Sequence, residues 1–535
     1  MIRAHTAADV RAAEAPLLAA GNPLMASAAF ALATVVTGEL RRRGGRVSGS
    51  VVLLLVGGGN NGGDALYAGA HLVRRGCQVH AALLSAHAHP GGTEAARAAG
   101  VRLHEVHRES DPADVVVALA RRAGVWVDAL TGIGARGPLR DPLGPVVAAL
   151  AAERAAWPDE PLVVAVDVPS GIGVDDGTVP GPVLPADVTV TMGTAKPGLL
   201  LPPAADVAGR VEVVELGLSG PLAAGDGPSV CTLTGADVAD LWPVPGPGDH
   251  KYSRGVLGLV AGSQTYPGAA ALAAAGALRT GLGMVRYLGP EVPTAMVRQH
   301  HPEVVAVPGR VQAWVLGPGV DPADVARAQQ LEEHLAGALD ARLPVVLDAG
   351  ALALVHEDAH PDLPATAVLT PHAGELAALL TARGEDTDRD AVEAAPARHA
   401  RLAAEITGAT VLLKGAVTVV AAPDGPLYAQ DDATPWLATA GAGDVLAGVL
   451  GALLAAYGDV LAEDVRGDVP SDGAGLPASL AAAAALVHGR AARLAAGERV
   501  TEAGPRGWSR SRRGVPITAG DVAAAVPAAL RTVLG

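Results

Sequence analysis

Short hydrophobic runs alternate with helix-like segments along the first 220 residues. The runs that predict strands are Ser50–Val56, Gln78–Leu84, Val125–Leu130, Leu162–Val168, Val188–Met192 and Val211–Glu215. Continuous apolar runs of this length are typical of strands buried on both faces of a parallel sheet. Apolar residues with helical spacing over Asp64–Arg75 predict a helix between the first two strands. The alternation therefore predicts an α/β domain with a Rossmann-like parallel sheet and helices on both faces.

The same alternation starts again after Gly217–Pro228, a stretch rich in glycine, proline and small residues that predicts a linker. Strands are expected after it at Val256–Ala261, Gly283–Tyr287, Ala313–Leu316, Val345–Leu347, Ala367–Leu369, Thr410–Leu413 and Thr418–Ala421. Helices are expected at Gly268–Thr280, Pro322–Ala338, Gly374–Ala382, Asp444–Ala456, Leu480–Ala496 and Gly520–Leu534. We therefore expect two α/β domains, over residues 1–220 and 226–535.

The composition indicates a folded protein with a large core, because half of the 535 residues are hydrophobic and only 18% are charged. A net charge of −15 disfavours nucleic acid and anionic membranes as partners. The longest apolar tracts, Pro16–Leu40 and Val445–Tyr457, are expected to be buried helices rather than membrane spans. Two cysteines and a start without signal-peptide features predict a cytoplasmic protein.

The basic residues are strongly skewed towards arginine. Of 40 basic residues only three are lysines, Lys196, Lys251 and Lys414. Because an ammonium and a guanidinium differ in shape and hydrogen-bond geometry, a retained lysine indicates a site that needs the compact cation.

A glycine-rich segment, GGGNNGGD at Gly57–Asp64, follows the first predicted strand. Glycines at a helix start let backbone N–H groups approach a phosphate closely, so the segment is a candidate anion site. A dinucleotide-binding fingerprint also needs an acidic residue at the end of the next strand. That strand ends in Leu83-Leu84-Ser85, so an ordinary NAD-dependent dehydrogenase is disfavoured.

Three more polar loops follow predicted strands in this half. They carry Asp128 with the glycine-rich Gly132–Pro138, then Asp167 and Ser170, then Lys196. Ligands of open parallel sheets bind outside the carboxyl ends of the strands, so these loops are expected to converge on one site.

The motifs GNNGGD, VDALTGIGARGP, VDVPSGI and AKPG together resemble the NAD(P)H-hydrate epimerase family over about residues 1–217. The resemblance implies that Asp167 is catalytic. It also implies a potassium ion held by Asn61, Asp128 and Ser170, an oxygen ligand set that suits a hard cation. The residues that it implies for binding the hydrated dinucleotide are Asn60, Asn61, Gly62, Gly63, Asp64, Gly132, Ile133, Gly134, Ala135, Arg136, Gly137, Pro138 and Asp167.

The clearest motif of the second half is TAGAGDVLAGVLGALLA, Thr439–Ala455. Gly441, Ala442 and Gly443 would present backbone N–H groups at the start of a long helix, where they stabilise charge on a transferring phosphoryl group. Asp444 would lie in the first turn as the general base for a substrate hydroxyl.

Two neighbouring motifs support this site. VLLKGAVTVVA offers an ammonium, flexible backbone and a hydroxyl to a nucleotide through Lys414–Thr418. His372, in LTPHAGE, follows a predicted strand end. With HKYSRG and GSQTYPGAA, these motifs resemble the ribokinase-like ADP-dependent NAD(P)H-hydrate dehydratases over about residues 228–535. VLDAGAL departs from the family's DAD pattern, so the resemblance assigns no role to Asp348.

The resemblance implies two sets of binding residues in this domain. Ala269, Gly319, His372 and Asp444 would contact the hydrate, and Lys414, Gly415, Ala416, Val417, Thr418 and Gly443 would contact the adenine nucleotide.

Together the two halves imply repair of hydrated NADH and NADPH. The first would interconvert the two epimers at nicotinamide C6, and the second would dehydrate the S epimer with ADP and Mg²⁺, giving AMP and phosphate. The alternative is a vitamin-precursor kinase fused to a nucleotide-binding domain, which would accumulate a phosphorylated product. We expect small-molecule substrates and a homo-oligomer.

Overall fold

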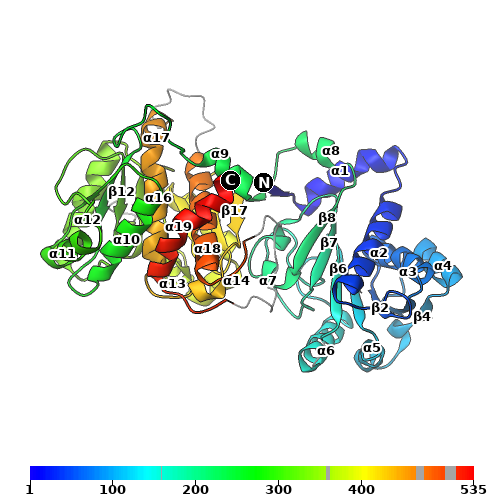
Figure 1. The fold of residues 1–535 in the computed structure, drawn as a ribbon. Coiled ribbons are helices and arrows are strands. Elements are labelled where there is room, and N and C mark those ends of the chain that lie inside the picture. Colours follow the sequence, from blue (N-terminus) through cyan, green and yellow to red (C-terminus); the bar gives the residue numbers. More distant parts are fainter. Residues whose placement is uncertain (158–159, 357–361, 465–474, 501–513) are drawn as a thin grey trace. The chain divides into compact units, whose positions relative to one another are not determined.

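The computed structural model describes residues 1–157, 160–356, 362–464, 475–500 and 514–535. These residues form two compact units, each built on its own sheet (Figure 1). The first unit contains residues 3–230, and the second contains residues 1–2 and the described residues from 231 onward. The predicted α/β class is confirmed for both units, which we describe separately.

The first unit has a seven-stranded sheet in the order β4-β3-β2-β5-β6-β7-β8, and all of its neighbouring strands run parallel. Its strands are β2 (Val51–Val56), β3 (Gln78–Leu83), β4 (Arg102–His104), β5 (Val125–Ala129), β6 (Leu162–Val166), β7 (Val188–Met192) and β8 (Arg210–Val214). The chain builds outward from β2 to β4 and then returns to β5 on the other side. The sheet therefore changes direction between β2 and β5.

Helices cover both faces of this sheet (Figure 1). The helices of the unit are α1 (Ala7–Ala19), α2 (Leu24–Arg42), α3 (Gly59–Arg74), α4 (Pro90–Ala99), α5 (Pro112–Ala120), α6 (Leu143–Ala156), α7 (Ala205–Ala208), α8 (Ser219–Ala223) and the short 3₁₀ turns η1 (Val106–Arg108) and η2 (Pro197–Leu199). Along β2, Val52, Leu54 and Val56 pack towards α2, α3 and α4, while Leu53 and Leu55 pack towards α5 and α6. This burial on both faces explains why the strand is apolar at every position.

The second unit is built on a ten-stranded sheet in the order β1-β9-β17-β16-β15-β14-β13-β12-β10-β11, in which β1 and β9 each include one or two residues counted in the first unit. Its strands are β1 (Ile2–Ala4), β9 (Val230–Thr232), β10 (Val256–Val260), β11 (Met284–Tyr287), β12 (Ala313–Leu316), β13 (Val345–Leu347), β14 (Ala367–Leu369), β15 (Thr410–Leu413), β16 (Thr418–Ala421) and β17 (Leu427–Gln430). The strands from β11 to β15 are parallel, and β16 and β17 add an antiparallel extension.

Helices also lie on both faces of this sheet. They are α9 (Gly235–Leu241), α10 (Pro267–Arg279), α11 (Glu291–His300), α12 (Val325–Asp340), α13 (Ala373–Ala382), α14 (Arg389–Ala394), α15 (Pro396–Thr407), α16 (Ala442–Ala456), α17 (Gly458–Asp464), α18 (Leu476–Ala495), α19 (Ala519–Leu534), η3 (Ala349–Leu354) and η4 (Pro435–Leu437). α10, α16, α18 and α19 share one apolar cluster, and α12, α13 and α15 share another. The first cluster is built largely from alanine, which lets these helices approach closely.

The structure differs from the sequence prediction at the glycine-rich motif and at the linker. The motif is helical from Gly59, five residues before the predicted start. The predicted linker contains α8, in which Leu222 is buried. Both differences arise because packing against the rest of the unit stabilises helices in segments of low helix propensity.

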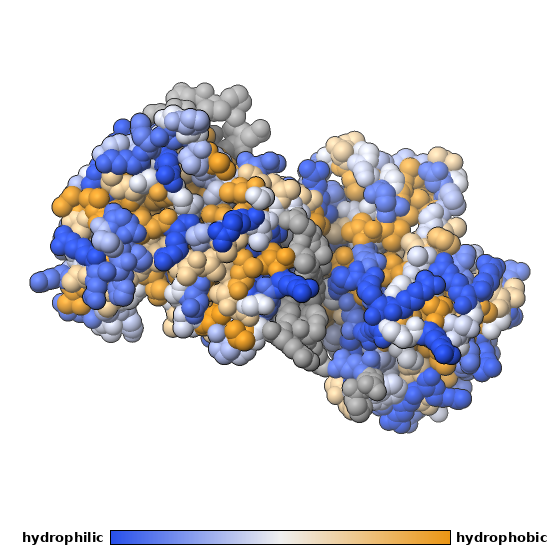
Figure 2. All heavy atoms as spheres, viewed as in Figure 1, coloured by the Kyte–Doolittle hydropathy of each residue, from blue (hydrophilic) through white to orange (hydrophobic). Residues whose placement is uncertain are grey.

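One helix among the described residues, α2, is long and apolar enough to cross a membrane by length and composition. Its residues Ala29, Leu32, Ala33 and Val36 are fully buried in the core of the first unit, and α2 packs against α3. Figure 2 shows hydrophilic residues spread over the visible face of each unit, with apolar residues between them. The burial of these four α2 side chains agrees with the prediction of a buried helix in this apolar tract.

Candidate active sites

The first candidate site lies where the seven-stranded sheet changes direction. The segment after β2 begins α3, and the segment after the adjacent parallel strand β5 carries Asp128 and the Gly132–Pro138 loop. A crevice at such a point is the usual ligand site of an open α/β sheet. The N–H groups of the first α3 turn have no partners within the helix, so they are available to an anion.

The glycines of this site allow close packing. A Cβ atom at Gly132 would lie 3.2 Å from the Cβ of Asn61, so the predicted loop and the start of α3 are in contact. A Cβ at Gly62 would lie 2.5 Å from the carbonyl oxygen of Gly57, and one at Gly63 would lie 2.9 Å from the His89 ring. Gly62 and Gly63 are therefore needed for packing, in addition to the binding role that the sequence predicts.

Asp128 and Ser170 form a buried polar cluster at the ends of β5 and β6. The hydroxyl of Ser170 donates to Oδ1 of Asp128 at 2.6 Å, and its backbone N–H donates to Oδ2 at 2.8 Å. Asp128 is fully buried, which raises the pKa of its carboxyl, while the bonds from Ser170 act in the opposite direction. A buried carboxylate needs a counter-charge to stay ionised, so a bound cation would suit this position.

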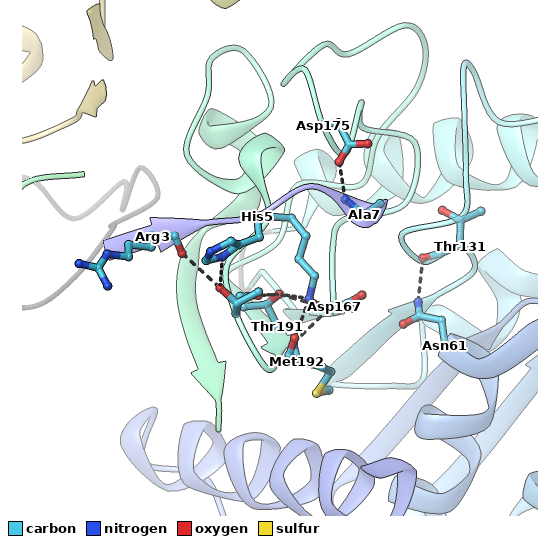
Figure 3. Close-up of polar contacts among 11 residues, drawn as sticks. Arg3, His5, Ala7, Asn61, Thr131, Asp167, Asp175, Thr191 and Met192 are labelled. Atoms are coloured by element: carbon cyan, nitrogen blue, oxygen red, sulfur yellow. Dashed lines mark hydrogen bonds and ion pairs between the residues drawn. The ribbon is translucent and has the colours of Figure 1, made fainter. Parts of the chain in front are cut away.

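Asn61 joins the same cluster from α3. Its Nδ2 donates to the carbonyl oxygen of Thr131 at 2.7 Å (Figure 3), which leaves its Oδ1 free of that bond. The Oγ1 of Thr131 is buried and makes no hydrogen bond. The predicted potassium ligands therefore lie together, and an unpartnered buried hydroxyl lies beside them. An oxygen set of this kind fits a hard monovalent or divalent cation.

Asp167 follows β6 and occupies the left-handed region, with φ 66°. Its Oδ1 accepts hydrogen bonds from the Met192 N–H at 3.1 Å, from Thr191 Oγ1 at 3.2 Å, and from the ammonium of Lys196 (Figure 3). Lys196 is fully buried, and its Nζ also donates to Thr191 Oγ1 and to the Met192 carbonyl. A strained backbone held by a dense polar network is typical of a functional residue.

Two further carboxyl groups lie close enough to this ion pair to interact with it electrostatically. Burial raises the pKa of Asp64 to about 8; repulsion from Asp167 and Glu14 adds to this shift, and attraction to Lys196 opposes it. The Oδ1 atom of Asp64 has no hydrogen-bond partner. Burial also raises the pKa of Glu14 on α1, while Lys196 lowers it and Asp167 raises it further. The site thus contains a carboxyl that is mostly protonated at neutral pH beside an ion-paired one. A carboxyl that keeps its proton at neutral pH can act as a general acid.

The second candidate site lies between β10 and β12, where the ten-stranded sheet changes direction in the same way. Gly319, after β12, has φ 64°, and a Cβ there would collide with the Cβ of Ala269 at the start of α10. Leu272 lies one turn further along α10, and a Cβ at Gly441 would lie 2.5 Å from its side chain. The predicted residues Ala269 and Gly319 therefore lie near the start of α16.

α16 begins at Ala442 after Gly441, which has φ 87°. Asp444 is in the first turn, as predicted for the motif. Burial, with repulsion from Asp348 added and attraction from Lys414 opposing it, raises the pKa of Asp444 to about 7. A carboxyl with this pKa can accept a proton from a substrate hydroxyl near neutral pH.

Lys414 brings the ends of three elements together. Its Nζ lies 2.8 Å from Oδ1 of Asp348, which follows β13, and 3.6 Å from Oε2 of Glu375 on α13. A Cβ at Gly443 would lie 3.5 Å from the same Nζ. Burial alone would lower the pKa of Lys414, but the two carboxylates outweigh it and raise the pKa.

The remaining predicted residues divide into two groups. Gly415 and Ala416 are exposed in the turn between β15 and the antiparallel β16, whereas the Val417 side chain is buried. His372 caps α13: its Nδ1 accepts the Glu375 N–H at 3.1 Å. The His372 side chain is exposed, and its Nε2 lies 3.6 Å from Oε1 of Glu375, so the predicted contact with the hydrate stays a prediction.

Sequence reasoning assigned no site role to Glu375, Thr131 or His488. His488 on α18 is buried beside Ala442 of α16; burial lowers its pKa to about 4, and its Nε2 has no partner. An isolated histidine in an alanine-rich helix gives no signal of this contact. Asp348 carried a signal, because it follows a strand end like the other site residues.

Two family models match the chain. The model described as NAD(P)H-hydrate dehydratase covers residues 257–507, and the one described as YjeF-related protein N-terminus covers residues 21–198. The chain is 45% identical over 458 residues to the bifunctional NAD(P)H-hydrate repair enzyme Nnr of Mycobacterium tuberculosis, with 83% of this chain and 88% of the relative covered. It is 42% identical over 507 residues to the enzyme of that description from Mycobacterium leprae, with 92% and 94% covered.

A single-domain relative and a solved structure match one part each. The NAD(P)H-hydrate epimerase of Clavibacter sepedonicus is 48% identical over 217 residues, which are 40% of this chain and 90% of the relative. A crystal structure of an ADP/ATP-dependent NAD(P)H-hydrate dehydratase from Bacillus subtilis is 26% identical, with a TM-score of 0.44, and covers 56% of this chain and 98% of its own.

Proposed function

The chain belongs to the family of bifunctional NAD(P)H-hydrate repair enzymes, and from this premise we propose which residues carry out each step of the repair. The substrate is NADH or NADPH with a hydroxyl at C6 of the reduced nicotinamide, a form that cannot donate hydride. We assign epimerisation at C6 to the first unit and dehydration to the second, because the two family matches fall in these units in that order.

Epimerisation requires a bond at C6 to break and re-form on the opposite face. Whether the C6–O or the C6–N1 bond breaks, one heteroatom must gain a proton while another group accepts one. Asp64 keeps a proton at neutral pH and can give it, and Asp167, paired with Lys196, can accept one. The N–H groups at the start of α3 and the Gly132–Pro138 loop would bind the dinucleotide phosphates.

Potassium fits the cluster of Asn61, Asp128 and Ser170, since it would provide the counter-charge for the buried Asp128 carboxylate. When bound, it would supply positive charge at the strand ends and fix these side chains in place. The unpartnered Thr131 hydroxyl lies in the same cluster. In the proposed epimerisation, every proton transfer is carried by Asp64 and Asp167.

Dehydration converts the C6 hydroxyl into a better leaving group. Asp444 would take the proton of the C6 hydroxyl while the oxygen of that hydroxyl attacks the terminal phosphorus of ADP. This step gives AMP and a C6 phosphate ester. The N1 lone pair then expels phosphate, and loss of a proton from C5 restores the dihydronicotinamide. The N–H groups at the start of α16 and the Lys414 ammonium would stabilise the transferring phosphoryl group.

Mg²⁺ would reach this site with the nucleotide. Within the described part of the chain, no group of three or more His, Cys, Asp or Glu side chains could hold a metal ion. Mg²⁺ is commonly bound through one or two carboxylates together with substrate phosphates. Because the phosphates would supply most of its ligands, the proposal assigns no side chain of this chain to the ion. The homo-oligomer and the cytoplasmic location stay predictions.

The observation that carries the dehydratase assignment is the position of Asp444 at the start of α16, close enough to Lys414 and Asp348 for both to shift its pKa. The test is to incubate the full chain with both hydrate epimers, Mg²⁺, K⁺ and either ADP or ATP, and to follow the absorbance of reduced nicotinamide. Release of phosphate with NAD(P)H is expected. A stable phosphorylated hydrate without NAD(P)H would indicate the alternative kinase and contradict the proposal.

A further inference from the structure

Lys414 is held at the dehydratase site from two directions. The carboxylate of Asp348 accepts its hydrogen bond at 2.8 Å, and that of Glu375 lies 3.6 Å away. The backbone N–H of Lys414 donates to the Pro371 carbonyl at 2.8 Å, so the strand end itself is fixed beside α13. Because hydrogen bonds hold both its backbone N–H and its ammonium, the charge of Lys414 is fixed next to Gly443.

Asp348 is the more strongly constrained of the two carboxylates. It is only 2% exposed, and the hydroxyl of Thr370 donates to its Oδ1 at 2.7 Å. The following residue, Ala349, has φ 46°, a costly conformation for a residue with a side chain. A Cβ at Gly350 would collide with the Val320 carbonyl, so there is no space there for the second acidic residue of a DAD pattern. The chain thus keeps one carboxylate at this strand end and fixes it firmly.

We propose that Asp348 is a positioning residue of the dehydratase site, whose carboxylate holds the Lys414 ammonium between Glu375 and the start of α16, facing both the nucleotide phosphates and Asp444. This inference rests on the proposed function, since it assumes that Lys414 meets the nucleotide and that Asp444 takes the hydroxyl proton. Asp348 itself touches neither the substrate nor the reacting atoms, and it acts through Lys414.

The proposal has an electrostatic consequence for Asp444. The charged groups near the start of α16 are Asp348 after β13, Lys414 after β15 and Glu375 on α13, and the titratable His488 on α18 is neutral near pH 7. Asp348 raises the pKa of Asp444, and Lys414 lowers it. The two partners of one ion pair therefore act on the base in opposite directions.

The test compares Asp348→Asn and Lys414→Met in the full chain, using the pH dependence of kcat/KM for ADP-dependent dehydration. The acid limb is the pH range in which kcat/KM falls as the base becomes protonated. Asp348→Asn should move this limb to lower pH, and Lys414→Met should move it to higher pH, each by on the order of half a pH unit to one unit. Asp348→Asn should also raise the KM for ADP roughly tenfold, because Lys414 loses its charged anchor. Asp340→Asn, an exposed aspartate at the end of α12, is the matched control and should change neither quantity.

A merely structural role would lower activity or stability without moving the two acid limbs apart. Overlapping pH profiles for both variants, or an unchanged KM for ADP in Asp348→Asn, would overturn the proposal. If Asp348→Asn does not fold, Lys414→Met decides alone, and an acid limb that stays in place or moves to lower pH is the contrary result. Failure of the proposed function looks different, since wild-type protein would then show no nucleotide-dependent dehydration. Epimerisation by both variants should remain at the wild-type rate.

Discussion

Lys196 is fully buried and donates a hydrogen bond to Oδ1 of Asp167, a residue whose own backbone is left-handed. The second unit repeats this relationship between Lys414 and Asp348. In both units the aspartate follows a parallel strand and the lysine comes from a later strand end. Two of the three lysines in the chain thus anchor strand-end carboxylates, while Lys251 lies over the Tyr252 ring at 5.1 Å. The ion pairs fix charge where the substrates are proposed to bind.

Asp444→Asn should abolish dehydration and leave epimerisation intact. Loss of a positioned base typically costs about 10²–10⁴-fold in rate. The measurement is phosphate release and NAD(P)H absorbance with ADP, together with separation of the two epimers by chromatography. An Asp444→Asn protein that dehydrates at the wild-type rate would show that another group takes the hydroxyl proton.

The pH dependence of dehydration should follow the Asp444 carboxyl. Because the pKa of Asp444 is raised to about 7 and the base must be ionised, kcat/KM should fall tenfold per pH unit below about pH 7 and level off above it. This limb should be absent from epimerisation, which uses other groups. A dehydration rate that stays constant from pH 5 to pH 8 would be at odds with Asp444 as the base.

The fold was largely predictable because its signals are local, and the proposed site residues lie at places in it that the sequence also marks. Apolar runs buried on both faces define β2 and β5, and glycines followed by Asp444 define the start of α16. β17 was not predicted, although it forms an antiparallel hairpin with β16 and the connection between them contains the turn sequence Pro423-Asp424-Gly425. The partnership of Lys414 with Asp348 was also beyond the sequence, since it joins residues 66 positions apart through the order of the strands.

Asp167→Asn should separate the two activities in the opposite sense. The variant loses the carboxylate that pairs with Lys196, so epimerisation should stop while ADP-dependent dehydration continues. Given both epimers, the variant should consume one and leave the other, which then reacts only as fast as it epimerises spontaneously. Adding Asp444→Asn protein in trans should release the remaining epimer. Consumption of both epimers at one rate by Asp167→Asn alone would exclude Asp167 from epimerisation.

Potassium should stabilise the first unit through Asp128. KCl should raise the unfolding temperature of the wild type more than LiCl at equal ionic strength, and Asp128→Asn should remove the difference, because it deletes the one formal charge of the ligand set. Thr131→Val should reduce the difference if the unpartnered hydroxyl adds to the site. Equal effects of the two salts on the wild type would argue against a potassium site, whatever the activity of the variants.

Asp64→Asn should stabilise the first unit and impair it as an enzyme. The folded-state pKa of Asp64 is about 8, against an ordinary value of 3.8, so the native state binds more protons than the unfolded state between these pH values. Stability therefore falls as pH rises through this window, and the loss is complete above about pH 8. An asparagine cannot ionise, so the variant should match the wild type near pH 4 and exceed it by on the order of a few kcal/mol at pH 8.

Calorimetry of the full chain at several pH values measures this gain, and Asp226→Asn, an exposed aspartate, is the matched control that should show none. Epimerisation by Asp64→Asn should fall, because the proton that the carboxyl donates is gone. The two readouts must move in opposite directions, since the burial that makes the ionised carboxylate costly is also what keeps its proton available to the substrate. A variant that is destabilised at pH 8, or that epimerises as fast as the wild type, would show that Asp64 does not hold the catalytic proton.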